Sequence, residues 1–98
     1  MKILITAANS ANAYNLKNKL NSADIISGDY FDLPAFMLKQ GKLIQLPNPV
    51  SISYVHLMLT LCLDQQINTV YALREEEFSV LNNSKQLFEE YGIEIVKG

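Results

Sequence analysis

Cysteine, glycine and surplus positive charge are all scarce in this sequence. The 98 residues contain one cysteine, Cys62, and four glycines. A lone cysteine cannot form an internal disulfide and cannot supply the thiolates of a zinc site, which fits a reducing compartment. Eight lysines and arginines stand against ten aspartates and glutamates, for a net charge of −2. Without a basic excess to pair with phosphates, we expect no nucleic-acid partner.

Long apolar runs are missing as well. The longest, Val55 to Leu63, is interrupted by His56 and Thr60 and is too short to cross a bilayer. The N-terminal residues turn polar at Asn9, too early for the core of a signal peptide. We therefore expect a cytoplasmic protein with no membrane partner. Hydrophobic residues still make up 49% of the chain, which is enough for the core of one small domain, residues 1–98.

Short apolar runs alternate with stretches of helical spacing, and this alternation is the main indication of the fold. Strands are expected at residues 2–7, 23–27, 42–46, 68–73 and 93–96, and helices at 11–20, 52–66 and 75–91, with a helical turn at 35–38. Ser10 suits the N-cap of the first helix, and Gly92 suits the end of the last. The order predicts an α/β fold: a three-layer, Rossmann-like, five-stranded parallel sheet with helices on both faces.

Ligands of such sheets bind at the carboxyl ends of the strands, near the point where the strand order reverses. The loop after the first strand, residues 7–12, contains no glycine, so the G-x-G-x-x-G fingerprint of dinucleotide binding is absent. Its small residues and the helix start behind it could bind an anion. Alternatively, the loop is a tight turn with a helix cap.

Two further loops are expected at the same end of the sheet. Gly28-Asp29-Tyr30 follows the second strand and is typical of a turn in which Asp29 accepts hydrogen bonds from backbone amides. Arg74-Glu75-Glu76-Glu77 follows the fourth strand. Arg74 could hold a substrate carboxylate. The alternative is a solvated helix start whose glutamates are stabilised by the helix dipole.

The histidine and the cysteine carry little functional signal. His56 is the only histidine and has no triad context, so a partly buried helix residue is favoured over a general base. Cys62 lies between Leu61 and Leu63, which is typical of an inert core thiol. We therefore assign no catalytic residue and no metal ligand.

The helix expected at residues 52–66 is apolar around most of its circumference. One face should pack on the sheet, and its members are Ile52, Val55, Leu59 and Cys62. Leu57, Met58 and Leu61 are then left over. Contiguous exposed apolar surface usually marks an interface, so we expect a partner on this helix.

Several segments, taken in order, have a familiar sequence and spacing. They are KILITAANS at 2–10, GDY at 28–30, LPNP at 46–49, YVHLMLTLCLD at 54–64, VYALREEEF at 70–78 and NSKQLFEEYGI at 83–93. Together they resemble the N-terminal domain of ATP-grasp enzymes. The likeness is greatest to the pre-ATP-grasp module of proteins similar to the carbamoyl-phosphate synthase large subunit, and it covers essentially the whole chain.

The resemblance implies a domain that precedes a two-lobed ATP-grasp body. Such enzymes join a carboxylate to an amine through an acyl-phosphate, and the resemblance places ATP and Mg²⁺ in that body, outside these residues. It also implies that the first domain helps to hold the acceptor substrate. By position, the residues concerned are Ala8, Asn9, Ser10, Ala11, Glu75 and Glu76. The first loop of the family is commonly rich in glycine, and this one departs from that pattern.

We therefore expect residues 1–98 to be the substrate-presenting domain of an ATP-grasp carboxylate–amine ligase, inactive alone. Arg74 joins the carried-over residues as a candidate for binding a small-molecule substrate. The expected partner is an ATP-grasp domain, in the same chain or another, or a second copy of this chain, packed on helix 52–66. The alternative is a stand-alone α/β interaction or dimerisation module without catalysis.

Overall fold

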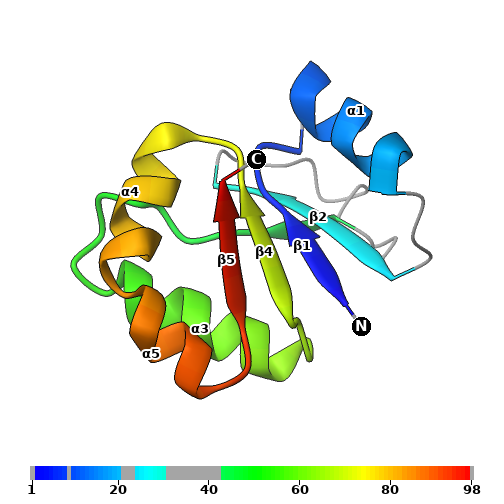
Figure 1. The fold of residues 1–98 in the computed structure, drawn as a ribbon. Coiled ribbons are helices and arrows are strands. Elements are labelled where there is room, and N and C mark those ends of the chain that lie inside the picture. The colour runs from blue at the N-terminus through cyan, green and yellow to red at the C-terminus, as the bar shows by residue number, and fades with distance from the viewer. Residues whose placement is uncertain (1, 9, 21–23, 31–42, 98) are drawn as a thin grey trace.

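The chain folds into a five-stranded parallel sheet with helices on both faces (Figure 1), as the alternation of segments predicts. The computed structural model describes residues 2–8, 10–20, 24–30 and 43–97. Its elements, in order, are β1 (Ile3–Ile5), α1 (Ala11–Leu20), β2 (Ile25–Asp29), β3 (Leu43–Gln45), α3 (Tyr54–Asp64), β4 (Thr69–Ala72), α4 (Glu75–Asn83), α5 (Lys85–Glu90) and β5 (Glu94–Lys97). The helical turn expected at 35–38 lies outside the described residues.

Side chains of β1 alternate between two apolar clusters, one on each face of the sheet. Ile3 and Ile5 pack with Ile25 and with Ala13 of α1. Leu4 points the other way, into a larger cluster to which α3, α4 and α5 all contribute. Because neighbouring residues of a strand face opposite sides, a strand covered on both faces is apolar at every position. This accounts for the unbroken run Ile3-Leu4-Ile5.

The strand order β3-β2-β1-β4-β5 places β1 at the centre. The chain moves outward from β1 to β2 and β3, and then returns to pair β4 with the other side of β1. The order therefore reverses at β1. In sheets of this type the ligand site lies at that reversal, outside the carboxyl ends of the strands. We call the end of the sheet where β1, β2 and β4 finish the carboxyl edge.

The helix expected over 75–91 is in fact two helices, α4 and α5, separated at Ser84. Ser84 has φ −115° and ψ 22°, outside the helical range, and its backbone N–H donates to the carbonyl of Leu81 at 3.0 Å. Asparagine and serine favour such breaks because their side chains compete for backbone hydrogen bonds. Gly92 ends α5 as predicted, with φ +74°.

Helix α3 packs on the sheet through only part of the face expected: Leu59 and Cys62 are buried as predicted, and Val55 is partly buried against the larger cluster. Its buried residues are Tyr54, Met58, Leu59 and Cys62. Met58, expected outside the core, is fully buried, whereas Ile52 is fully exposed. The reason is that α3 begins at Tyr54, so that Ile52 lies in the preceding turn. Leu57 and Leu63 remain exposed, at 48% and 45% of their surface.

Candidate functional site

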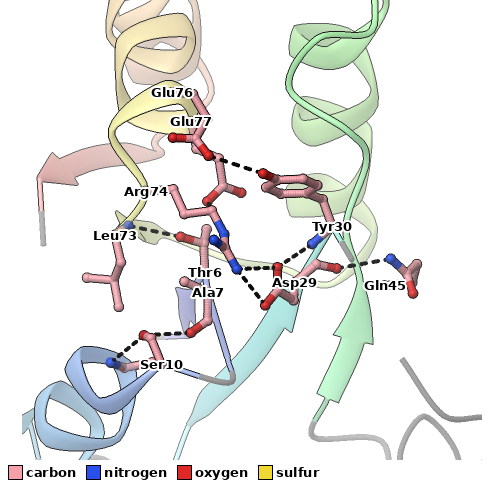
Figure 2. A network of polar contacts seen from close by, with 11 residues as sticks. Thr6, Ala7, Ser10, Asp29, Tyr30, Gln45, Leu73, Arg74, Glu76 and Glu77 are labelled. Carbon is pink, nitrogen blue, oxygen red and sulfur yellow. Dashed lines mark hydrogen bonds and ion pairs between the residues drawn. The ribbon is translucent and has the colours of Figure 1, made fainter. Parts of the chain in front are cut away.

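The turn between β1 and α1 is ordered by Ser10. Its Oγ accepts a hydrogen bond from the backbone N–H of Ala13 at 3.1 Å and donates to the carbonyl of Ala7 at 2.8 Å (Figure 2). The predicted N-cap is therefore confirmed. Ala7 has φ +53°, a left-handed conformation uncommon for alanine, and the Ser10 side chain helps to hold it. Asn9, a candidate for substrate binding, lies outside the described residues.

Strand β2 ends at a close approach to the next strand. A Cβ at Gly28 would lie 2.8 Å from Cγ of Leu46 and 3.0 Å from the carbonyl oxygen of Ile44. Only glycine leaves room for this packing. The close approach fixes the backbone immediately before Asp29, a buried polar residue of the carboxyl edge.

Asp29 is fully buried and pairs with Arg74. The Arg74 Nη2 donates to Oδ1 at 3.1 Å and to Oδ2 at 3.0 Å, and the backbone N–H of Tyr30 donates to Oδ1 at 2.8 Å. The amide contact of Asp29 was predicted from the sequence, whereas the ion pair was not. The turn predicted at Gly28 and Asp29 is wrong, because both residues continue β2. β2 and β4 both flank β1, so this pair passes across the end of the central strand.

Tyr30 connects the same arginine to helix α4. The centroid of its ring lies 5.0 Å from Arg74 Cζ, within the range of a cation–π contact. Its hydroxyl donates to Oε1 of Glu76 at 3.1 Å. Partial removal from water, and then the hydrogen bond and charge of Glu76, raise the pKa of the Tyr30 hydroxyl. The Asp29–Arg74 ion pair and the Tyr30–Glu76 hydrogen bond thus join the start of α4 to the end of β2.

Glu77 is the least expected member of the site. A solvated helix start was one of two interpretations of this segment, yet the Glu77 side chain is fully buried. Burial above all raises the pKa of its carboxyl to about 7. The Thr6 hydroxyl and the Arg74 charge act in the opposite direction. Figure 2 shows Glu77, Arg74 and Thr6 at the centre of the network.

The contacts of Glu77 are weak for so buried a group. Arg74 Nε lies 3.9 Å from Oε1, too far for a hydrogen bond. Thr6 accepts a hydrogen bond at Oγ1 from the backbone N–H of Leu73 at 2.9 Å, which leaves its own hydrogen to point towards Glu77. Even so, neither oxygen of Glu77 has a hydrogen bond of ordinary geometry with any residue that the structure describes.

The remaining candidates from the sequence surround this network. Ala8 and Ser10 are half-buried, while Ala11, Glu75 and Glu76 are exposed. Arg74 lies between them, with 25% of its side chain exposed. The carboxyl edge therefore brings the two candidate loops to one end of the sheet. The signal for the missed pair was the opposite charge of Asp29 and Arg74, which follow strands on either side of β1.

Two side chains considered from the sequence lie away from the carboxyl edge. Cys62 is fully buried, and burial raises the pKa of its thiol to about 12, which confirms an inert core thiol. His56 is exposed, so the expectation of partial burial is wrong. The side of α3 that packs on the sheet carries Met58, Leu59 and Cys62, and His56 lies outside it. In the described part of the chain, no group of three potential ligands could hold a metal ion.

The fold and the edge described above define the chain as a Rossmann-like α/β domain without a glycine-rich phosphate loop. Residues 3–96 match the family described as "PylC-like, N-terminal domain", and the chain belongs to that family. This is a pre-ATP-grasp-type domain of ATP-grasp ligases. The resemblance to ATP-grasp N-terminal domains is thus confirmed at this coarser level. Across the described ranges, no helix is long and apolar enough to span a membrane.

A solved structure supports the fold. L-threonine dehydrogenase from Phytophthora infestans aligns with a TM-score of 0.61 at 13% identity, over 97% of this chain and 34% of that chain. At this identity the likeness concerns the fold alone, and this chain spans about a third of the length of the dehydrogenase. No curated protein matches the sequence.

Proposed function

We propose that this chain is the substrate-presenting domain of an ATP-grasp carboxylate–amine ligase related to the carbamoyl-phosphate synthase large subunit. Membership of the PylC-like N-terminal domain family supports a place in an ATP-grasp-type ligase. In this proposal ATP and Mg²⁺ are bound by an ATP-grasp domain, in the same chain or in another, and the described domain has no activity alone. Its own task is to hold a small-molecule substrate.

The observation that carries the proposal is the arrangement of the two candidate loops around the carboxyl edge. The helices α1 and α4 both begin there, after β1 and β4, which are neighbours in the sheet. Their first residues, Ala11 and Glu75, are exposed. Arg74 is already engaged by Asp29, so its role is to hold the edge in shape around a substrate bound by the loops.

The substrate role can be tested by nuclear magnetic resonance on the 98-residue chain. Pooled amino acids, inorganic phosphate and ATP are added separately to ¹⁵N-labelled protein. We expect amide shifts at Ser10, Ala11, Glu75 and Glu76 with an amino acid or phosphate. ATP should shift only the amides that inorganic phosphate also shifts. If no probe moves these amides, the chain does not hold a substrate at this edge.

A charge variant makes the test sharper. Ala11→Asp places a carboxylate in the first turn of α1, where the helix dipole stabilises it, and should repel an anionic probe from the same amides. Binding of phosphate or of a substrate carboxylate is expected to weaken about tenfold, equivalent to about 1.4 kcal/mol. Asn15→Asp adds the same charge at an exposed position one turn later and should change binding much less.

The exposed side chains of α3 favour a second candidate, a module for association. Leu57 and Leu63 are 48% and 45% exposed on this helix, and Val50 and Ile52 are exposed in the segment before it. Here residues 52–66 would contact a second copy of this chain. Light scattering that shows a stable dimer, together with no ligand shift at the carboxyl edge, would favour association over substrate presentation.

A further inference from the structure

Glu77 combines full burial with poor pairing. Buried carboxylates are ordinarily paired with a cation or accept several hydrogen bonds, because an uncompensated buried charge is strongly destabilising. Glu77 has no exposed side-chain surface. Its oxygens lack hydrogen bonds of ordinary geometry to the described residues, and Arg74 Nε stays at 3.9 Å. This environment disfavours the ionised form and favours a bound proton.

Charged and titratable groups face Glu77 from α3, α4 and the end of β2, and the Thr6 hydroxyl faces it from the end of β1. The charged and titratable groups are Arg74 and Glu76 at the start of α4, Asp29 at the end of β2, Tyr30 after it, and Tyr54 on α3. The charges of Asp29 and Glu76 raise the pKa of Glu77, and the Arg74 charge lowers it. Burial, and next the Glu77 charge, raise the pKa of Tyr54, so this hydroxyl stays neutral. Arg74 is therefore the cation that can compensate the negative charge of Glu77 when Glu77 ionises.

Arg74 does not pair equally with the two buried carboxyl groups, Asp29 and Glu77. Its Nη2 is committed to Asp29 at 3.0 and 3.1 Å, and its Nε faces Glu77 at the longer distance. While Glu77 carries a proton, the guanidinium compensates the Asp29 charge. When Glu77 loses the proton, a second buried anion attracts Nε, and the guanidinium must shift towards it.

We propose that Glu77 gains and loses a proton within the folded domain, and that this proton decides how Arg74 is shared between Asp29 and Glu77. The protonated form holds the start of α4 against the end of β2 through the Asp29–Arg74 pair. The ionised form draws Arg74 towards α4 and loosens that connection. The carboxyl edge thereby has two arrangements, selected by a single proton, and neither requires a bound ligand.

The proposal is tested by following the side chains themselves in the ¹⁵N- and ¹³C-labelled chain. Carbon shifts of the glutamate carboxyls are recorded from pH 4 to pH 9, together with the Nε–H signal of Arg74. We expect the Glu77 carboxyl to titrate with a midpoint near 7, while an ordinary glutamate titrates near 4.3. The Arg74 signal should shift with the Glu77 midpoint.

Two variants separate Glu77 from its neighbours. Glu77→Gln should abolish the shift of Arg74 around neutral pH. Glu75→Gln removes the same charge from an exposed position two residues away and should leave that shift in place. The proposal is overturned if Glu77 titrates like an ordinary glutamate, or if Arg74 does not respond when it titrates. Both results come from the unmodified chain, so they stand even if Glu77→Gln does not fold.

Discussion

At the scale of single residues, Arg74 holds the carboxyl edge together through contacts of unequal strength. It donates to the Asp29 carboxylate at 3.0 and 3.1 Å, lies 5.0 Å from the ring centroid of Tyr30, and keeps 3.9 Å from Glu77. A guanidinium suits this position because it is planar and stays charged at any ordinary pH. Lysine could not make the same set of contacts.

Glu77→Gln is expected to stabilise the domain at alkaline pH. The pKa of Glu77 is raised from 4.5 to about 7 in the folded chain, so the folded state binds this proton more tightly than the unfolded state. The stability that the proton contributes is complete below about pH 4.5 and is lost as the pH rises to about 7. The loss of stability approaches about 3 kcal/mol. Glu77→Gln should not show this loss, because glutamine does not ionise.

Urea unfolding at pH 5 and at pH 8 measures this difference. The unmodified chain should lose stability between the two, and Glu77→Gln should lose much less. Glu75→Gln, at an exposed position, should behave like the unmodified chain. Equal pH dependence in all three proteins would contradict a proton held by Glu77.

Arg74→Ala is expected to destabilise the domain more than Asp29→Asn does. Without the guanidinium, the Asp29 charge stays buried and loses its cation, which costs about 3–5 kcal/mol. In Asp29→Asn, the partly exposed Arg74 can turn to solvent, and the loss should be smaller. The measurement is the free energy of unfolding in urea at pH 6.

The double variant provides the control for that comparison. If the two side chains act as a pair, Arg74→Ala should cost little once Asp29 is already asparagine. Additive losses would mean that the destabilisation comes from elsewhere in the fold.

The sequence predicted that the loops after β2 and β4 lie at one end of the sheet, but it did not predict the ion pair that joins them. Parallel topology brings the ends of β2 and β4 to one edge, which placed Asp29 and Arg74 there. Their contact also depends on register, since Ile5 pairs with both Ser27 and Tyr71. No local pattern contains that register. The burial of Glu77 was missed for a related reason, because helix phase decides which of three successive glutamates faces the sheet.

At the scale of elements, the sequence predicted the helices and strands whose positions depend on local contacts. The α1 helix was predicted with its observed bounds, because Ser10 caps it and Ala13 faces the sheet. The break at Ser84 was missed, since the apolar spacing continues through it from Leu81 to Phe88. Periodicity shows which face is buried and does not show whether the backbone is continuous.

Ser10→Ala is expected to destabilise the domain by about 1 kcal/mol through loss of the α1 cap. The substitution also removes the hydrogen bond from Oγ to the carbonyl of Ala7. Ser10→Asp retains an acceptor for the Ala13 amide and should lose less stability. Thermal unfolding of the three proteins measures the difference, and equal melting temperatures would argue against the cap.

Gly28→Ala is expected to cost about 1–3 kcal/mol, as overpacking does in a closed interior. The added Cβ would meet Leu46 side-chain atoms at 2.8 and 2.9 Å and a backbone oxygen at 3.0 Å, and the backbone cannot yield easily. Ser27→Ala, in the same strand, adds no volume and is the matched control. Urea unfolding that shows no difference between the variants would contradict the close approach of β2 to β3.

At the scale of the whole molecule, the sheet is covered on both faces, but α3 keeps apolar surface in solvent. The larger cluster draws on α3, α4 and α5, and the smaller one on α1. The fold class was predictable because five apolar segments alternating with helices leave few topologies. The exposed apolar surface of α3 was predicted together with one of its members, Leu57, whereas Met58 is buried and the exposure of Leu63 was not predicted.

Leu57→Gln and Leu63→Gln together should leave folding stability nearly unchanged, since substitutions at exposed positions usually alter it by less than about 0.5 kcal/mol. If α3 contacts a second copy, the same double variant should be monomeric where the unmodified chain is dimeric. Light scattering measures the mass, and unfolding in urea provides the stability control. A dimer unaffected by both substitutions would place the contact on another surface.

The central position of β1 also governs the order in which the chain can acquire its structure. β1 is made first, yet one of its sides can be paired only by β4, which follows β2 and β3. Until β4 emerges during synthesis, the apolar strand Ile3–Ile5 has an open side, the kind of exposed strand that promotes association between chains. Parallel pairing over such a sequence distance is slow to form. The domain is therefore most open to association between chains before β4 can pair with β1.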